Sequence, residues 1–212
     1  MSSYYRGTVS VPQSRFDWKF EIPTWVKIYE LLLNLANQIR NAGFKPDVIV
    51  GISRGGWPPA RIMSDLLENP ELANVKAEFY LGVAETKGEP VITQPVSVSV
   101  KGKRVLVVDD VADTGRSLRL VRLHLKEQGA VDVKIATIYY KPWSVVTPDW
   151  YERKTGHWII FPWERKETVR DVVKRFKSEG KTIEEAKETL IRYGLDRKLV
   201  ERFLEKILEG QA

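Results

Sequence analysis

The segment from Val105 to Leu118, which reads V-L-V-V-D-D-V-A-D-T-G-R-S-L, constrains the fold more than any other part of the chain. It begins with an apolar run rich in valine, which is typical of a strand buried on both faces of a parallel sheet. From Leu118 onward the apolar residues recur with helical spacing, and Gly129 ends that stripe. The segment therefore predicts a strand, a short polar loop and a helix, the repeating unit of an α/β protein.

The polar loop between the expected strand and helix has residues suited to binding a phosphate. Asp109 and Asp110 stand where buried parallel strands present functional groups, and Asp113 opens the loop. Backbone N–H groups at a helix N-terminus and the positive end of the helix dipole favour an anion. Residues 114–117 add hydroxyl groups and a glycine that lets the backbone approach a ligand. Helix capping alone would need one acid, whereas this loop has three, so the pattern predicts a phosphate site.

A second segment predicts another strand, loop and helix. Residues 47–50 read as a buried strand, and an amphipathic helix is expected from about Pro58 to Leu67. Between them lies G-I-S-R-G-G, in which glycines surround Ser53 and Arg54. Such a loop can turn its main-chain N–H groups toward an anion. An isolated arginine is often a surface residue, but its place among the glycines favours contact between Arg54 and the anion.

Two segments farther along predict a pocket for a planar ring. Residues 133–140 alternate like a strand and are rich in β-branched side chains, and Lys141 follows them directly. The later run W-I-I-F-P-W begins at Trp158, whose large rigid ring offers stacking area at little entropic cost. Ile159 and Phe161 are expected in the core of a short strand.

These segments together resemble the type I phosphoribosyltransferases. The segment from Val105 to Leu118 resembles their motif for phosphoribosyl pyrophosphate (PRPP) over its whole length, and S-R-G-G resembles the pyrophosphate loop of the purine branch. Lys141 and Trp158 resemble the pocket of 6-oxopurine phosphoribosyltransferases, in which a lysine meets the group at C6 and an aromatic ring stacks on the base. The resemblance implies an α/β fold of the type I phosphoribosyltransferase class, with a mostly parallel sheet flanked by helices.

The resemblance also implies a reaction, the transfer of the 5-phosphoribosyl group from PRPP to a ring nitrogen of a purine base. Pyrophosphate and AMP or another purine nucleotide would be the products. Asp113 would be the catalytic acid or base near N7 of the purine. Mg²⁺ would be the cofactor, bound mainly by PRPP oxygens and contacted by Asp109 and Asp110 only indirectly, through PRPP. The expected contacts are, to PRPP, Asp109, Asp110, Val111, Ala112, Asp113, Thr114, Gly115, Arg116 and Ser117; to pyrophosphate, Ser53, Arg54, Gly55 and Lys87; and to the base, Lys141, Trp158, Ile159 and Ile160.

A polar segment lies at the position of the mobile loop that closes over the active site in this family. It covers residues 82–95 and is punctuated by Gly88 and Pro90. There Lys87 could reach pyrophosphate, and closure would keep water away from PRPP. The segment is equally compatible with an exposed connection in which Lys87 is solvated.

The last part of the chain has a different character. Three amphipathic helices are expected, at Glu164–Lys177, Thr182–Arg192 and Arg197–Leu208. We therefore expect a phosphoribosyltransferase domain that includes the base-binding segment over residues 1–163, and a C-terminal helical bundle over residues 164–212. Most purine enzymes of the family end soon after the base-binding segment. The tail is similar to the helical C-terminal third of crenarchaeal adenine phosphoribosyltransferases, which are built on a 6-oxopurine scaffold.

Two clues to the base disagree. A protonated Lys141 is a donor and suits the oxygen of hypoxanthine or guanine, whereas adenine presents an amino donor at that position. The tail favours adenine, and for that reason adenine is narrowly preferred at this point, with main-chain carbonyls near Trp158 accepting from the amino group. The alternatives are a hypoxanthine, guanine or xanthine phosphoribosyltransferase, and a non-catalytic regulator that senses PRPP and binds nucleic acid. An intact Asp113 favours an enzyme over the regulator, and Trp158 disfavours a pyrimidine or orotate enzyme.

Composition and charge narrow the other possibilities. The net charge of +6 arises from basic residues interspersed with acids, as on ordinary solvated faces, so nucleic acid is not an expected partner. An anionic substrate such as PRPP also suits a positive cleft. The chain contains no cysteine, which excludes disulfides and thiol chemistry. No stretch is apolar enough to cross a membrane, and the first residues lack the apolar core of a signal peptide, so a cytoplasmic enzyme is expected. The resemblance implies a homodimer.

Overall fold

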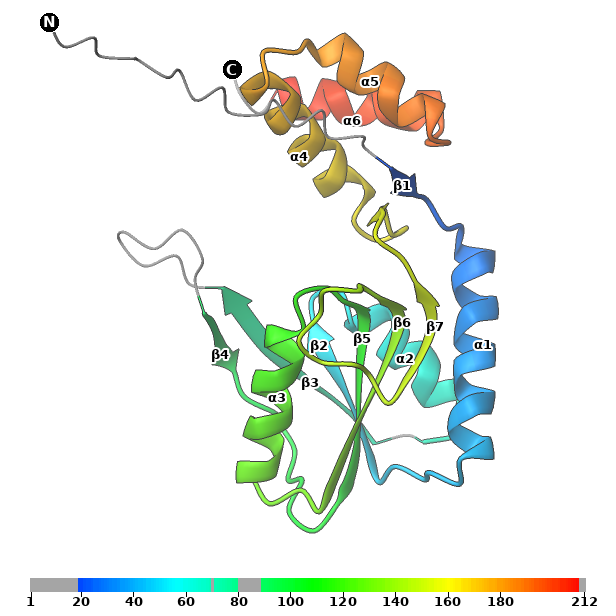
Figure 1. The fold of residues 1–212 in the computed structure, drawn as a ribbon, viewed down its shortest axis with the longest axis vertical. Coiled ribbons are helices and arrows are strands. Elements are labelled where there is room, and N and C mark those ends of the chain that lie inside the picture. The colour runs from blue at the N-terminus through cyan, green and yellow to red at the C-terminus, as the bar shows by residue number, and fades with distance from the viewer. Residues whose placement is uncertain (1–18, 70, 80–88, 210–212) are drawn as a thin grey trace, which may run out of the picture.

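The computed structural model describes residues 19–69, 71–79 and 89–209. Its centre is a six-stranded sheet with the order β4-β3-β2-β5-β6-β7. All neighbouring strands in this sheet are parallel except β4, which pairs antiparallel with β3 at one edge (Figure 1). This architecture confirms the expected α/β fold with a mostly parallel sheet. The strands are β2 (Val48–Ser53), β3 (Leu72–Phe79), β4 (Pro90–Gln94), β5 (Arg104–Ala112), β6 (Asp132–Tyr140) and β7 (Trp150–Lys154).

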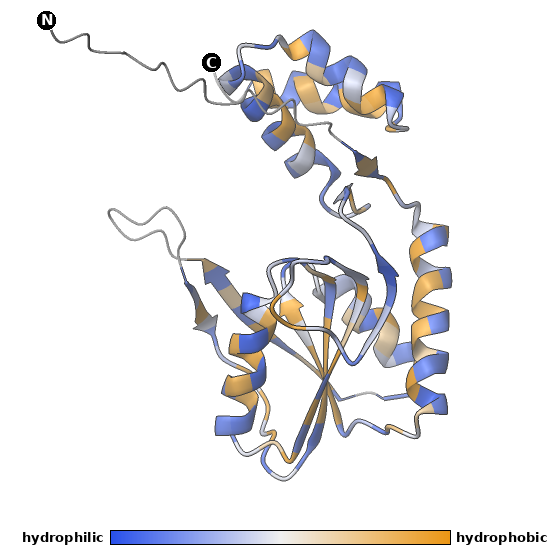
Figure 2. Ribbon diagram, in the orientation of Figure 1, coloured by the Kyte–Doolittle hydropathy of each residue, from blue (hydrophilic) through white to orange (hydrophobic). Residues whose placement is uncertain are grey.

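Three helices cover the two faces of the sheet. Helices α1 (Trp25–Asn41) and α2 (Trp57–Leu66) lie on one face, and α3 (Arg116–Glu127) lies on the other (Figure 1). Hydrophobic and hydrophilic residues alternate around these helices, as amphipathic helices require (Figure 2). Each helix therefore turns an apolar side to the sheet and leaves a polar side to solvent.

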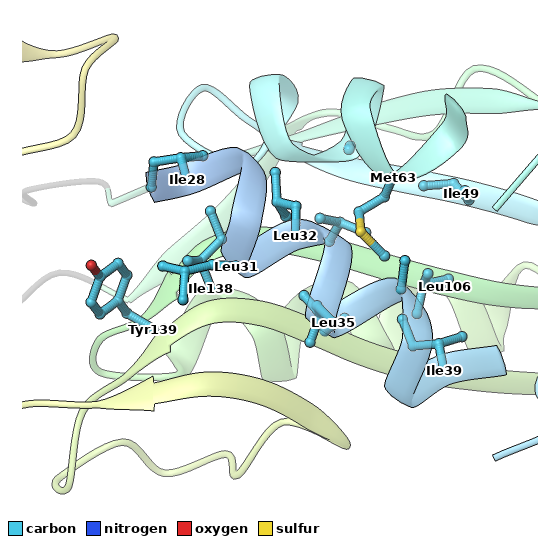
Figure 3. Packing of buried hydrophobic residues seen from close by; sticks show 14 of the residues in the cluster. Ile28, Leu31, Leu32, Leu35, Ile39, Ile49, Met63, Leu106, Ile138 and Tyr139 are labelled. Atoms are coloured by element: carbon cyan, nitrogen blue, oxygen red, sulfur yellow. The ribbon is translucent and has the colours of Figure 1, made fainter. Parts of the chain in front are cut away.

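The strands supply side chains to both faces because successive residues of a strand point in opposite directions. Ile49 packs with α1 and α2, whereas Val48 and Val50 pack with α3. On the first face, Leu32 and Leu35 of α1 lie between that helix and the strands (Figure 3). The near-continuous apolar runs seen in the sequence are explained by this burial on both faces.

Two expectations about the ends of elements need correction. Strand β5 does not end at Asp110 but continues to Ala112, because Val111 and Ala112 still pair with the neighbouring strand β6. Part of the expected loop at residues 82–95 is strand β4 (Pro90–Gln94), which pairs with β3. The remainder of that loop, including Lys87, lies outside the described residues, so lid closure stays a prediction.

Three further helices form a bundle above the carboxyl ends of the parallel strands (Figure 1). They are α4 (Arg165–Ser178), α5 (Ile183–Arg192) and α6 (Arg197–Glu209). Helix α5 begins with a capping box between Thr182 and Glu185. The bundle has its own hydrophobic cluster, in which side chains such as Val172 and Leu190 are fully buried. The expected helical bundle is therefore present.

A small two-stranded sheet connects the bundle to the rest of the molecule. Strand β1 (Phe20–Glu21) pairs in parallel with β8 (Trp158–Ile159). Phe20 of β1 and Ile160, the residue directly after β8, belong to the hydrophobic cluster of the bundle. The bundle core thus includes residues from both sides of position 163, and the boundary between residues 163 and 164 stays a prediction.

Candidate active site

The two loops that the sequence pointed to meet at the carboxyl edge of the sheet, where β2 and β5 are neighbours. A Cβ atom added to Gly55 would lie 2.8 Å from Cγ of Asp110, and one added to Gly56 would lie 2.8 Å from Oδ1 of Asp109. A side chain at either glycine would collide with a carboxylate. The glycines of the S-R-G-G loop therefore permit the close approach of this loop to the two acids.

The two acids lie in β5, so their side chains leave the backbone on opposite sides. The N–H group of Asp110 donates to Oδ1 of Asp109 across 3.0 Å. Burial raises the pKa of Asp110 to about 6. Burial also raises the pKa of Asp109 well above its usual range, and the charge of Asp110 adds to that shift. Both carboxylates are therefore short of compensating positive charge.

The predicted phosphate loop forms the N-terminus of α3. Gly115 precedes the helix with a φ of +74°, a conformation that favours glycine, and has no side chain to cap the helix. The N–H group of Arg116 donates to Oγ1 of Thr114 at 3.4 Å. A Cβ at Gly115 would lie 2.8 Å from the backbone nitrogen of Val146, so the loop after β6 packs closely against it. Arg116 forms an ion pair with Glu89 at 3.4 Å. The other N–H groups at this helix end have no side-chain cap among the described residues and suit an anion, and phosphate binding here stays a prediction.

A pocket of about 410 Å³ lies beside these loops. Lys141 follows β6, is only 6% exposed, and donates from Nζ to the carbonyl oxygen of His157. Burial lowers the pKa of this ammonium group. The carboxylate of Asp113, which also lines the pocket, accepts a hydrogen bond of 3.0 Å from Nε1 of Trp143. The pocket is lined by Asp110, Val111, Asp113, Lys141, Trp143, Gly156, Trp158, Ile159, Phe161 and Glu164.

The structure brings most of the expected site residues together, with some exceptions. Among the residues expected to bind the base, Ile160 does not line the pocket. Its side chain is buried in the cluster of the bundle, and its N–H group donates to the carbonyl of Glu21 at 2.8 Å. Ala112 is buried in the core on the α3 side of the sheet. The hydroxyl group of Ser53, expected at pyrophosphate, accepts a hydrogen bond from Nδ2 of Asn74 at 3.3 Å.

Four residues in or beside the pocket were not assigned to the site from the sequence, and one of them, Phe161, was expected only as a core residue. Trp143 and Phe161 line the pocket, and Trp163 donates from Nε1 to Oδ2 of Asp110 at 3.3 Å. Glu164 lines the pocket as well, and burial, aided by the charge of Asp110, raises its pKa to about 7. An acid directly after the aromatic run W-I-I-F-P-W is the signal that could have indicated Glu164.

Comparison with known proteins agrees with this geometry. The model of the phosphoribosyl transferase domain family matches residues 21–167. The chain is 31% identical to a xanthine-guanine phosphoribosyltransferase of Gluconobacter oxydans over 118 residues, which are 55% of this chain and 67% of that protein. It is 36% identical to a hypoxanthine-guanine phosphoribosyltransferase of Streptococcus pneumoniae over 102 residues, 48% of this chain and 56% of that protein. The chain thus spans about two thirds of the first relative and little more than half of the second.

A solved structure extends the likeness. The purine phosphoribosyltransferase from Pyrococcus horikoshii is 40% identical, with a TM-score of 0.62, over 68% of this chain and 93% of that chain. None of these three relatives is named an adenine enzyme, so the resemblance to crenarchaeal adenine enzymes is not confirmed. Within its described part, the chain has no helix that is long and apolar enough to cross a membrane. The chain belongs to the phosphoribosyl transferase domain family, in which it is a type I enzyme of the purine branch.

Proposed function

We propose that this enzyme transfers the 5-phosphoribosyl group from PRPP to a 6-oxopurine base, with release of pyrophosphate. The observation that carries the proposal is that Lys141 and Asp113 line one pocket beside the PRPP motif. This revises the narrow preference for adenine that the C-terminal tail suggested. The names of the relatives, which include xanthine, guanine and hypoxanthine, support the revision.

The choice of base rests on the hydrogen-bonding character of Lys141. An ammonium group has three donors, and one of them is taken by the carbonyl of His157. The remaining donors suit the acceptor oxygen at C6 of hypoxanthine, guanine or xanthine. Adenine would bring an amino donor to the same place, and a buried mismatch of this kind costs about 1–3 kcal/mol. A clear preference for 6-oxopurines is therefore expected.

The other residues have distinct roles in the proposed reaction. Trp158 offers a face on which the purine can stack, and Asp113 holds or moves a proton at N7 as the bond to the sugar forms. The open N-terminus of α3 binds the 5′-phosphate. Residues 53–55 bind the pyrophosphate that leaves. These positions hold the two reactants so that the base can approach the anomeric carbon in line.

The acids of β5 fit a reaction that uses Mg²⁺. The pKa values of Asp109 and Asp110 are raised by burial, so a nearby cation would stabilise their charged forms. Among the described residues, no group of three or more His, Cys, Asp or Glu side chains could hold a metal ion. We therefore propose that the ion is held mainly by PRPP oxygens and that the two aspartates contact it through PRPP and the ribose hydroxyls. When bound, Mg²⁺ would neutralise charge on the leaving pyrophosphate.

A panel assay tests the proposal. The full chain is incubated with PRPP, Mg²⁺ and adenine, hypoxanthine, guanine, xanthine or uracil, and the nucleotide product is identified by mass spectrometry. We expect kcat/KM for at least one 6-oxopurine to exceed that for adenine by about tenfold or more. The Lys141→Met variant should lose this preference, because it removes the donor to O6.

The possible outcomes are distinct. Faster turnover with adenine would overturn the base assignment and leave phosphoribosyl transfer intact. No turnover with any base, together with tight nucleic-acid binding that weakens steeply with salt, would instead favour the PRPP-sensing regulator.

A further inference from the structure

Arg54, in the loop proposed to bind pyrophosphate, is held by an acid from the C-terminal bundle. Its Nη2 atom donates to both carboxylate oxygens of Glu167, at 2.7 and 2.6 Å. Glu167 lies in the first turn of α4, 113 residues away in the sequence. The contact therefore links the S-R-G-G loop to the first helix of the bundle.

We propose that Glu167 is a positioning residue that orients the guanidinium group of Arg54 for pyrophosphate. The inference rests on the proposed function, because it assumes that the S-R-G-G loop binds the pyrophosphate of PRPP. It assigns to the C-terminal bundle a role in PRPP binding, in addition to any role beside the base.

The exposure of Arg54 explains why it needs an orienting partner. Its side chain is 75% exposed, so little packing restricts its rotamers. A long, unpacked arginine loses much conformational freedom when it binds a ligand. An ion pair that already fixes the side chain reduces the freedom that is still to be lost.

The way in which the two groups meet leaves Arg54 able to bind an anion. A guanidinium group carries five N–H donors in a rigid planar fork. In the described part of the chain, Glu167 accepts only from the Nη2 atom of Arg54. The donors on Nε and Nη1 remain for phosphate oxygens, which guanidinium groups bind well in pairs.

The ion pair is also poorly suited to a purely structural role. Glu167 is 45% exposed and Arg54 is 75% exposed, and ion pairs this exposed contribute little to stability. The neighbouring Gly55 lies against the carboxylate of Asp110, so the loop is already fixed by close packing. Loss of Glu167 should consequently affect ligand binding more than folding.

The test compares the full-length wild type with Glu167→Gln, which keeps the shape of the side chain and removes its charge. We expect KM for PRPP to rise roughly two- to fivefold, with KM for the base and the melting temperature unchanged. Glu167→Asp should restore part of the PRPP affinity. Glu188→Gln is the matched control, because Glu188 pairs with Arg197 at 3.0 Å within the bundle and both partners are 51% exposed.

A double-mutant cycle with Arg54→Ala separates positioning from a general charge effect. If Glu167 acts through Arg54, the Glu167→Gln change should have no further effect on PRPP binding when Arg54 is already alanine. An equal effect in both backgrounds would overturn the proposal. So would an unchanged or lowered KM for PRPP in Glu167→Gln, the latter because it would mean that Glu167 competes with pyrophosphate for Arg54.

The behaviour of the wild type separates a failure of the proposed function from a failure of the inference about Glu167. Failure of the wild type to bind Mg²⁺-PRPP in calorimetry would overturn both the proposed function and this inference. Normal transfer by the wild type with an unaffected Glu167→Gln variant would overturn the inference alone.

Discussion

Nε1 of Trp163 donates a hydrogen bond to Oδ2 of Asp110 across 3.3 Å, and this contact joins the base-binding segment to the PRPP motif. Trp163 also stacks on the pocket residue Phe161, with ring centroids 4.9 Å apart and an angle of 10° between the planes. One indole ring therefore touches both the wall of the base pocket and an acid proposed to face the ribose. Base binding and PRPP binding share a structural support at this point.

Trp163→Phe should weaken PRPP binding while keeping the aromatic stack. The hydrogen bond from Trp163 lowers the pKa of Asp110 against the effect of burial, so its loss should raise that pKa further. A lost hydrogen bond of this kind is worth about 0.5–1.5 kcal/mol, so KM for PRPP should rise about two- to tenfold. Trp25→Phe, which changes an exposed ring next to Trp163, is the control in PRPP saturation curves. Unchanged PRPP saturation in Trp163→Phe would show that the hydrogen bond does not support the site.

Gly55→Ala should disrupt PRPP binding more severely, because its methyl group would overlap the carboxylate of Asp110. We expect at least a tenfold fall in kcat/KM for PRPP, with far-ultraviolet circular dichroism like that of the wild type. Gly156→Ala is the comparison variant for PRPP kinetics: Gly156 lines the base pocket, but its added Cβ would meet nothing closer than the Trp143 ring at 3.7 Å. Equal PRPP kinetics in the two variants would argue against close contact between the S-R-G-G loop and Asp110.

The strands β2, β5 and β6 and the helices α2 and α3 could be predicted from the sequence because buried parallel strands and amphipathic helices have distinct apolar patterns. Strands β4 and β7, at the two edges of the sheet, were not predicted. The end of β5 could not, since Asp is uncommon in strands and suggests a loop. In the structure, pairing of Val111 with Tyr139 carries the strand past both acids. Pairing of β5 with β6 thus overrides the local preference of aspartate for loops.

The motif residues of the site could likewise be predicted, whereas their partners could not. Trp163 and Asp110 are 53 residues apart, and Arg54 and Glu167 are 113 residues apart, so no local pattern connects them. Ile160 was expected at the base as part of the segment that resembles the base-binding segment of the family, but it belongs to the core of the bundle. Residues two apart along extended backbone share a side, and Trp158 and Ile160 accordingly both contact the hydrophobic cluster of the bundle, whereas Ile159 and Phe161 pack in the core beside α1.

Glu164 should make stability depend on pH in the protein free of PRPP and Mg²⁺. Its pKa rises from an ordinary 4.5 to about 7 through burial, then through the charges of Asp110 and Glu167, with Arg54 acting in the opposite direction. Between these two values the folded state binds more protons than the unfolded state, so this contribution to stability is present at low pH and is lost as pH rises toward 7. The melting temperature of Glu164→Gln minus that of the wild type should therefore increase as pH increases from about 4.5 to 7.

Asp47 is the control for this pH effect, because its pKa is shifted in the opposite direction to that of Glu164. Hydrogen bonds from Arg104 lower the pKa of Asp47 from its ordinary 3.8 to about 2, so the stability that Asp47 contributes is lost as pH falls from 3.8 through 2, below the range of this test. Asp47→Asn should therefore differ from the wild type by a constant amount from pH 4.5 to 7. A constant difference for Glu164→Gln over the same range would contradict the assigned pKa shift.

The bundle should also influence the base pocket, through a row of aromatic rings. Phe20 lies 5.1 Å from Tyr193 of the bundle and 6.2 Å from the pocket residue Trp158, measured between ring centroids. Tyr193→Ala should raise KM for the base about two- to tenfold and leave KM for PRPP unchanged, because edge contacts of this kind are worth about 0.5–1.5 kcal/mol. Truncation after about Lys166 should have a larger effect on base binding or impair folding.

Leu208→Ala, which changes an exposed apolar residue of α6, is the control for Tyr193→Ala. A soluble truncated enzyme with unaltered kinetics would show that the bundle does not support the base pocket. If Tyr193→Ala raised only the KM for PRPP, Tyr193 would act on PRPP binding and not on the base pocket.

The most direct test of the proposed function is the Asp113→Asn variant, because the proposed role of this carboxylate in the reaction is to hold or move a proton at N7 of the purine. The variant keeps the size of the side chain and its ability to accept a hydrogen bond from Trp143, but it cannot exchange a proton with N7. We predict that calorimetry will show Mg²⁺-PRPP binding like that of the wild type, while kcat with the preferred base falls about 10²–10⁴-fold. Turnover near that of the wild type would contradict the central claim that Asp113 is the catalytic acid or base of phosphoribosyl transfer.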